Sequence, residues 1–188
     1  MTTASPHSMR IAPSPWIERY AYLVPVGGRV LDLAAGSGRH AQFFAARGNR
    51  VVAVDCDENS LAAIAGRAGI EARVLDLETD RWPLAGEIFD AIVVANYLHR
   101  ASIPKLFEML ASDGTLLYET FAVGNEAYGR PTNPDFLLRE GELLELARER
   151  LTVVAFEQGL SSNRDKPAVI ERIAAVGPAR AWPPKLSP

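Results

Sequence analysis

Short apolar runs that alternate with helix-type patterns restrict the fold of this chain more than any other feature. Strands that alternate with helices form a mostly parallel sheet, because each helical crossover brings the chain back to the same edge. Strands are expected at 30–34, 50–55, 72–77, 89–95 and 115–121. Helices are expected at 39–47, 58–67, 103–110 and 142–150. The sequence therefore predicts an α/β domain built around a parallel sheet.

The last two apolar runs, 151–157 and 168–176, break this alternation. Only the residues QGLSSNRDKP separate them, and that length is too short for a helical crossover. We expect the two runs to pair as an antiparallel hairpin that closes the sheet. A dinucleotide-binding domain ends differently, with a further strand–helix unit.

The composition of the 188 residues fits one compact domain and disfavours several partners. A net charge of −3 gives no basic face for nucleic acid, and no apolar run approaches the roughly 20 residues of a membrane span. No set of His, Cys or carboxylate residues has metal-ligand spacing, so no metal is expected. Cys56 is the only cysteine, which excludes an internal disulfide and favours a cytoplasmic location. A folded domain at 14–177 is expected between flexible tails at 1–13 and 178–188.

The stretch VLDLAAGSGRHAQFF, at 30–44, places a glycine turn between an apolar strand and a helix. Gly36 and Gly38 allow a tight turn and the close approach of a ligand, to which the helix presents free N–H groups. Asp32 lies inside the strand, where an unpaired carboxylate is costly to bury. An ammonium group on the ligand or N–H groups of the loop would satisfy it, whereas a pyrophosphate would be repelled. The turn therefore favours a cationic ligand with an amino-acid tail over NAD.

Two further carboxylates follow the next two predicted strands. Asp55 ends the second strand, where an acid accepts hydrogen bonds from both hydroxyls of a ribose. Asp76 lies near the end of the third strand, where it would face an adenine edge. The alternatives are that Asp55 caps the next helix together with Asp57, and that Asp76 is a surface acid.

The stretches VLDLAAGSGRH, VVAVD, VLDL and FDAIVVANYLH together resemble the successive motifs of the class I S-adenosylmethionine-dependent methyltransferases. The resemblance covers roughly 30–176 and includes the closing hairpin. It implies a three-layer αβα, Rossmann-like sandwich with a seven-stranded, mostly parallel sheet of order 3-2-1-4-5-7-6, in which strand 7 is antiparallel. The family pattern is acid-x-Gly-x-Gly-x-Gly, and Ala34 replaces its first glycine in this chain. We expect Ala34 to remain strand-like.

The resemblance places the cofactor, S-adenosylmethionine, at the ends of the first four strands. Gly36 and Gly38 would pass beneath its methionine part, and Asp32 would help to hold its ammonium group directly or through water. Asp55 would accept hydrogen bonds from the ribose hydroxyls. The full set of expected cofactor-binding residues is Asp32, Ala34, Gly36, Gly38, Asp55, Cys56, Asp76, Leu77 and Asn96.

The resemblance also places the adenine ring and the methionine end. Cys56 would lie beside the adenine ring, Asp76 would accept from its amino group, and Leu77 would offer a backbone N–H. Asn96 would border the methionine part or the methyl acceptor.

Acceptor-binding groups are expected where the fourth and fifth strands open into the ligand crevice. Methyl transfer depends mainly on alignment and water exclusion, and it needs a base only when the acceptor is protonated. Two segments resemble covers, a short helix within 14–24 and the long loop at 122–139. The expected catalytic residues are Tyr97 and His99. The expected acceptor-binding residues are Trp16, Arg19, Tyr20, Glu119, Tyr128 and Arg130.

Several of these assignments have structural alternatives. Trp16 and Tyr20 would equally anchor the N-terminal segment on the core, and His99 would equally begin a helix. His40, inside the first helix, is interpreted as structural or solvent-facing. Two arginines near the entrance would suit an anionic acceptor.

The sequence therefore predicts a bacterial, cytoplasmic methyltransferase that uses S-adenosylmethionine and a small-molecule acceptor, as a monomer or homodimer. The fourth strand is not followed by the Asn-Pro-Pro-Tyr motif of enzymes that methylate amino groups of nucleic acids and proteins. Three alternatives stay open. They are a methyltransferase acting on protein or RNA with a partner, an S-adenosylmethionine-binding protein without activity, and an NAD enzyme. Asp32 and the closing hairpin argue against the NAD enzyme.

Overall fold

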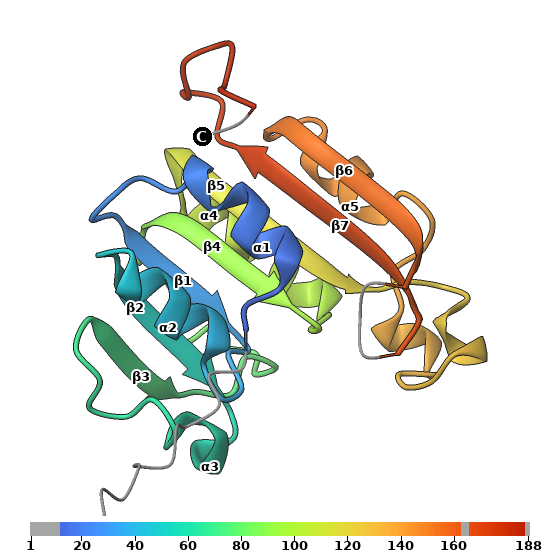
Figure 1. Ribbon diagram of the computed structural model, residues 1–188, viewed down its shortest axis with the longest axis horizontal. Coiled ribbons are helices and arrows are strands. Elements are labelled where there is room, and N and C mark those ends of the chain that lie inside the picture. The colour runs from blue at the N-terminus through green and yellow to red at the C-terminus, as the bar shows by residue number, and fades with distance from the viewer. Residues whose placement is uncertain (1–11, 163–165, 187–188) are drawn as a thin grey trace, which may run out of the picture.

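The computed structural model of the protein describes residues 12–162 and 166–186, so most of the tail expected at 1–13 lies outside the described residues. A seven-stranded sheet of order β3-β2-β1-β4-β5-β7-β6 forms the centre of the molecule (Figure 1). The strands are β1 Arg29–Leu33, β2 Arg50–Asp55, β3 Ile70–Val74, β4 Phe89–Ala95, β5 Leu110–Phe121, β6 Thr152–Ser161 and β7 Ala168–Val176. The pairs among β1 to β5 are parallel, whereas β7 is antiparallel to both β5 and β6. The expected strand order and the antiparallel closing hairpin are confirmed.

Helices cover both faces of this sheet. They are α1 Pro15–Tyr20, α2 Arg39–Ala46, α3 Glu58–Leu61, α4 Ile103–Met109 and α5 Glu142–Ala147, and the 3-10 turns are η1 Ala21–Leu23, η2 Arg100–Ser102, η3 Asn125–Ala127 and η4 Pro134–Phe136. Figure 1 shows α1 and α2 in front of the sheet and α4 and α5 behind it. Ser14 caps α1 by accepting from the N–H of Trp16, and Pro15 suits the first turn because its position there needs no N–H. The arrangement is the expected three-layer αβα sandwich.

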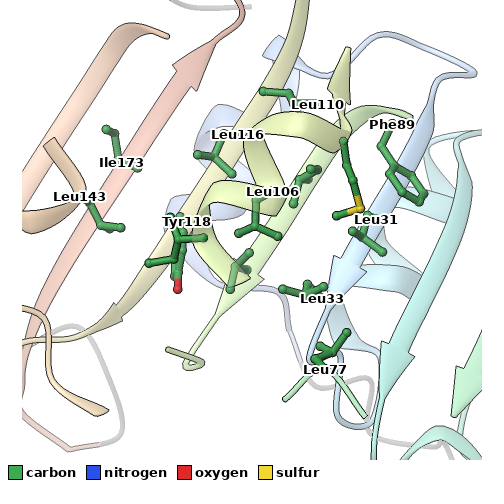
Figure 2. Packing of buried hydrophobic residues seen from close by; sticks show 14 of the residues in the cluster. Leu31, Leu33, Leu77, Phe89, Leu106, Leu110, Leu116, Tyr118, Leu143 and Ile173 are labelled. Atoms are coloured by element: carbon green, nitrogen blue, oxygen red, sulfur yellow. The ribbon is translucent and has the colours of Figure 1, made fainter. Parts of the chain in front are cut away.

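Two apolar clusters, one on each face, hold the three layers together. On the face of α4 and α5, Leu106 and Leu143 pack against the sheet beside Tyr118, as Figure 2 shows. On the face of α1 and α2, Trp16 and Phe44 are fully buried against the other side of the strands. The central strands are therefore buried on both faces, which explains why they read as continuous apolar runs in the sequence.

Several elements end earlier than the sequence pattern indicates. β3 ends at Val74 because that residue lies opposite Asp55, the last residue of its partner β2. The helix expected at 58–67 is α-helical only as far as Leu61 and continues as turns. The last predicted helix ends at Ala147. The central strands β1, β2 and β4 are specified by burial along most of their length, whereas these helix ends are set by local turns.

The long loop at 122–139 is ordered, with η3, η4 and one β-bridge between its two ends, Ala122 and Leu138. Arg100 fixes its second half. The guanidinium donates to the backbone oxygens of Asp135 at 2.9 Å and Leu137 at 2.7 Å. It also forms an ion pair with the buried Glu142 at the start of α5. The loop is thereby tied to both α5 and the end of β4.

The C-terminal segment, expected as a tail from residue 178, is attached to the domain at Arg180. One guanidinium nitrogen of Arg180 lies 3.1 Å from the backbone oxygen of Leu23 and 3.1 Å from the hydroxyl of Thr115. The part of the chain that the structure describes contains no helix that is long and apolar enough to cross a bilayer.

Truncating Leu106 to alanine tests the core behind the sheet. Leu106 is 2% exposed, so its loss leaves a cavity and should lower the free energy of unfolding by about 2–5 kcal/mol, measured by urea denaturation. Val26→Ala is the control, because that side chain is 90% exposed and its loss should cost less than about 0.5 kcal/mol. Equal stability of the two variants would contradict this packing.

Candidate functional site

The glycine turn joins β1 to α2 at the carboxyl edge of the sheet. Ala34, Gly36 and Gly38 all have left-handed backbone conformations, with φ of 54°, 53° and 73°. The expectation that Ala34 is strand-like is wrong, since β1 ends at Leu33 and Ala34 begins the turn. A left-handed conformation costs an alanine roughly 1 kcal/mol, so this residue is held in place by the turn around it.

The two glycines serve the turn in different ways. A Cβ on Gly38 would lie 2.5 Å from Cδ1 of Ile64, so no larger residue fits there without rearrangement. A Cβ on Gly36 would meet no other atom within 4 Å. The space beside Gly36 is therefore open to a ligand, whereas Gly38 is needed for packing.

The buried carboxylate of Asp32 ties β1 to the start of α2. Its Oδ2 accepts a hydrogen bond from the N–H of Ala41 at 2.8 Å, and the side chain is 1% exposed. Burial raises the pKa of Asp32 to about 7, although the hydrogen bond from Ala41 acts in the opposite direction. This helix N–H is the hydrogen-bond partner that a carboxylate buried in the strand requires. A further role in holding a cofactor stays a prediction.

His40 extends this contact to the segment that carries α1. Its Nδ1 lies 3.8 Å from Oδ1 of Asp32, and its Nε2 accepts from the N–H of Ser14 at 3.2 Å. Burial lowers the pKa of His40 to about 3, with a smaller contribution from the charge of Arg39. The imidazole is therefore neutral, and its hydrogen bond with Ser14 links the start of α2 to the segment that carries α1. This placement agrees with the structural interpretation of His40.

Asp55 lies beside the glycine turn, as the sequence places it. Its Oδ2 accepts from the N–H of Gly36 at 2.8 Å, and its Oδ1 accepts from the N–H of Asp57 at 2.9 Å. Asp57 in turn caps α3. Asp55 thus supports the start of α3 and also borders the open space at Gly36. The structure is compatible with both interpretations of this acid.

The remaining predicted cofactor residues follow β2, β3 and β4 at the same edge. Cys56 and Asp76 are exposed, whereas the side chain of Leu77 is buried in the core. Asp76 follows β3 instead of ending it, and it accepts from the N–H of Glu78 at 2.8 Å. Asn96 comes directly after β4 in a left-handed conformation, with φ of 58°. Their contacts with a cofactor stay predictions.

A cavity of about 1130 Å³ opens between α1, the carboxyl end of β5, η3 and the turn from β6 to β7. Arg39, which directly follows the glycine turn, also borders it. Of the predicted acceptor-binding residues, those in its walls are Trp16, Arg19, Glu119, Tyr128 and Arg130. We call it the cationic cavity, after the positively charged side chains Arg19, Arg39, Arg130, Lys166 and Arg172.

Arg172 of β7 is the main residue of this cavity that sequence reasoning missed. Its guanidinium lies over the ring of Trp16, 4.7 Å from the centroid, and one nitrogen is 4.0 Å from Glu119. Its Nε donates to Glu157 of β6 at 2.9 Å. The adjacent charges Glu171 and Arg172 inside an apolar strand were the sequence feature that would have indicated a special role.

Of the predicted catalytic and acceptor-binding residues, three lie outside the walls of the cationic cavity. Tyr20 is buried and packs against Trp16, so the anchoring interpretation describes its place. The hydroxyl of Tyr97 lies 3.5 Å from Glu78, and burial raises the pKa of Tyr97. His99 immediately precedes η2. The structure does not bring Tyr97 and His99 together with the acceptor residues, and their catalytic role stays a prediction.

Comparison with known families decides the nature of this domain. Residues 30–114 match the family model described as "Methyltransferase domain". This part of the chain is similar to a methyltransferase domain. The match spans the glycine turn, Asp55, Asp76 and Asn96, so the predicted cofactor edge lies within the matched segment. The resemblance that the motifs carried is confirmed.

The chain is also similar to one curated protein and to several solved structures. "Putative methyltransferase YqeM" of Bacillus subtilis is 30% identical over 115 residues, which cover 55% of this chain and 45% of that protein. TehB of Haemophilus influenzae is 20% identical, with a TM-score of 0.68, over 84% of this chain and 60% of TehB. The chain thus spans about half of the curated relative.

A third relative is a methyltransferase with ligands bound. It is the 1,6-didemethyltoxoflavin-N1-methyltransferase of Burkholderia thailandensis, solved with 1,6-didemethyltoxoflavin and S-adenosylhomocysteine. It is 23% identical with a TM-score of 0.63, over 85% of this chain and 75% of that one. The expected class I fold is confirmed, and S-adenosylmethionine is the cofactor with which this fold family works.

Replacing Asp32 by asparagine separates the effect of Asp32 ionisation on stability from the opposing effect of His40 ionisation. Because the folded pKa of Asp32 is raised to about 7 from its ordinary value of 3.8, stability falls as the pH rises from 3.8 to 7. Because the folded pKa of His40 is lowered to about 3 from its ordinary value of 6.5, stability rises with pH until 6.5 is passed. The two effects offset each other in the unaltered chain.

In Asp32→Asn only the histidine effect remains. Between pH 5 and pH 7, its free energy of unfolding should therefore rise by about 2 kcal/mol more than that of the unaltered chain. Urea denaturation at the two pH values measures this difference. The same pH dependence in both chains would refute the assigned protonation states.

Proposed function

We propose that this protein is an S-adenosylmethionine-dependent methyltransferase that binds a small-molecule acceptor in the cationic cavity. One observation carries the proposal. The glycine turn, with Asp55 bonded to Gly36, lies at the same sheet edge as a cavity of about 1130 Å³ that Arg39 also borders. Cofactor and acceptor would then occupy adjoining sites, which direct transfer between them requires.

The residues of the turn fit this cofactor. The open space at Gly36 leaves room for the methionine part, and the oxygens of Asp55 border that space. The carboxylate of Asp55 creates a negative potential that suits a sulfonium and an ammonium group. The same potential is unfavourable for the pyrophosphate of NAD. The turn therefore supports S-adenosylmethionine over a dinucleotide.

When bound, the cofactor supplies an electrophilic methyl group on a positively charged sulfur. The chain has to align the acceptor with that group and exclude water, and these two effects supply much of the acceleration. Phe121 and Tyr128 provide aromatic walls for this purpose. Glu119, 2% exposed at the end of β5, lies where it would orient the acceptor or take a proton from it.

The size of the cavity supports a small acceptor. A volume of about 1130 Å³ is at the upper end of the range typical of small-molecule sites. The Burkholderia relative was solved with a small heterocyclic compound bound, which points in the same direction. Methylation of a protein or RNA with a partner, and binding of the cofactor without catalysis, are the competing functions.

We also propose that the protein is bacterial and cytoplasmic, acting as a monomer or homodimer. The single cysteine, Cys56, is free and exposed, as suits a reducing compartment. Two of the relatives come from Bacillus subtilis and Haemophilus influenzae, which supports a bacterial source.

Ligand-induced stabilisation tests the cofactor. S-adenosylhomocysteine at millimolar concentration and tens-of-micromolar affinity should stabilise the chain by about 2 kcal/mol, or roughly 5 °C in Tm. Asp55→Ala should lose most of this shift, because the ribose hydroxyls lose their acceptor. Asp57→Ala is the matched control, since it removes the neighbouring acid but leaves the N–H that bonds Asp55.

Circular dichroism of both variants checks that they are folded. An undiminished Tm shift in Asp55→Ala, or a larger Tm shift with NAD than with S-adenosylhomocysteine, would contradict the proposed cofactor site.

Methyl-labelled S-adenosylmethionine tests the acceptor class. Incubation with a cell extract separated into metabolites, protein and RNA should label the metabolite fraction only. Label in protein or RNA would favour the competing substrates. Cofactor binding without label in any fraction would favour a protein that binds the cofactor but does not transfer its methyl group.

A further inference from the structure

The cationic cavity concentrates positive charge that the rest of the chain does not carry. Its walls contain five cationic side chains, Arg19, Arg39, Arg130, Lys166 and Arg172. One carboxylate, that of Glu119, also lines it. The whole chain has a net charge of −3, so this distribution runs against the overall balance. Like charges gathered in a cavity repel one another and raise its potential, which favours an anionic ligand.

Neighbouring carboxylates offset only part of this charge. Glu157 bonds Arg172 and lies 4.0 Å from Arg19, so one carboxylate serves two guanidinium groups. Glu119 lies 4.0 Å from Arg172 on the other side. Within residues 12–162 and 166–186, no carboxylate lies within ion-pair distance of Arg130. The cavity therefore keeps an excess of positive charge that a ligand would neutralise.

The residues in the walls of the cationic cavity favour an organic anion over an inorganic one. The guanidinium of Arg172 is held over the ring of Trp16 and by Glu157, so little freedom is lost when it binds a ligand. Phe121 and Tyr128 add further aromatic surface to the walls. A volume of about 1130 Å³ far exceeds the needs of an inorganic ion. A guanidinium group binds carboxylate and phosphate through paired hydrogen bonds, and aromatic walls suit the organic remainder.

We propose that the methyl acceptor is a small organic anion whose carboxylate or phosphate is bound by Arg19, Arg130 and Arg172. This inference rests on the proposed function, because it assigns the ligand of the cavity next to the cofactor turn. The anionic group supplies the charge that the cavity lacks, and the rings of Phe121 and Tyr128 contact the rest of the molecule.

Binding of simple probes to the full chain tests this inference. The chain is first saturated with S-adenosylhomocysteine and then titrated with benzoate, phenyl phosphate or neutral benzamide, with Tm as the readout. The two anions should raise Tm more than benzamide does, and added salt should weaken the effect. Arg130→Gln should raise the apparent Kd of the anions about tenfold or more. Arg19→Gln should act in the same direction.

Arg81→Gln is the matched control, because Arg81 is exposed and outside the walls of the cavity. Its apparent Kd for the anions should equal that of the unaltered chain. Benzamide that binds as tightly as benzoate, or anion affinity unchanged in both Arg130→Gln and Arg19→Gln, overturns the inference. Failure to bind S-adenosylhomocysteine overturns the proposed function itself, so the two failures are distinguishable.

An activity experiment identifies the source of the anion. A metabolite extract is separated by anion exchange before incubation with methyl-labelled S-adenosylmethionine, and label should appear with the retained, anionic fraction. Loss of acceptor from that fraction after phosphatase treatment indicates a phosphate, and persistence indicates a carboxylate. Label confined to the unretained fraction, or to RNA, overturns the inference while leaving the methyltransferase activity in place.

Discussion

A buried hydrogen bond, from the N–H of Ala41 to the carboxylate of Asp32, holds the functional edge of this molecule in place. Burying a carboxylate is costly, and here the N-terminal end of α2 offsets the cost with an N–H group and a favourable dipole. The bond fixes how α2 leaves the turn and so places Gly36 next to its partner acid. His40, the residue before Ala41 in α2, accepts from the N–H of Ser14 and so ties α1, one wall of the cavity, to the same helix.

The carboxyl edge of the sheet has opposite charge at its two ends. Carboxylates border the glycine turn, whereas arginines and a lysine line the cavity beyond Arg39. If the proposed function is correct, the cationic methyl donor would lie beside the carboxylates and the anionic acceptor beside the arginines. If the anionic group is also the one methylated, transfer would cancel both charges, and a water-poor site favours such a reaction. The charge pattern thus supports methyl transfer from a cationic donor to an anionic acceptor, although the overall charge of the chain is small.

The sequence predicted the strands and the closing hairpin well, because burial on both faces and a short connection leave few alternatives. The family resemblance supplied the strand order. Ala34 was predicted wrongly, since a left-handed alanine cannot be recognised from its residue type. The cavity was predicted only in part, because Arg172 and Lys166 lie far along the chain from α1 and only the tertiary fold brings them to the same cavity. Tyr97 and His99 follow β4 as expected, but the walls of the cavity do not include them.

A crystal structure of the chain with S-adenosylhomocysteine is the most direct test that the cofactor lies beside Asp55 and next to the cationic cavity. Both ribose hydroxyls should lie within hydrogen-bond distance of Asp55, and the sulfur atom should face the cationic cavity with no protein segment between them. A nucleoside bound away from Asp55, or a sulfur atom separated from the cavity by α1, would contradict it.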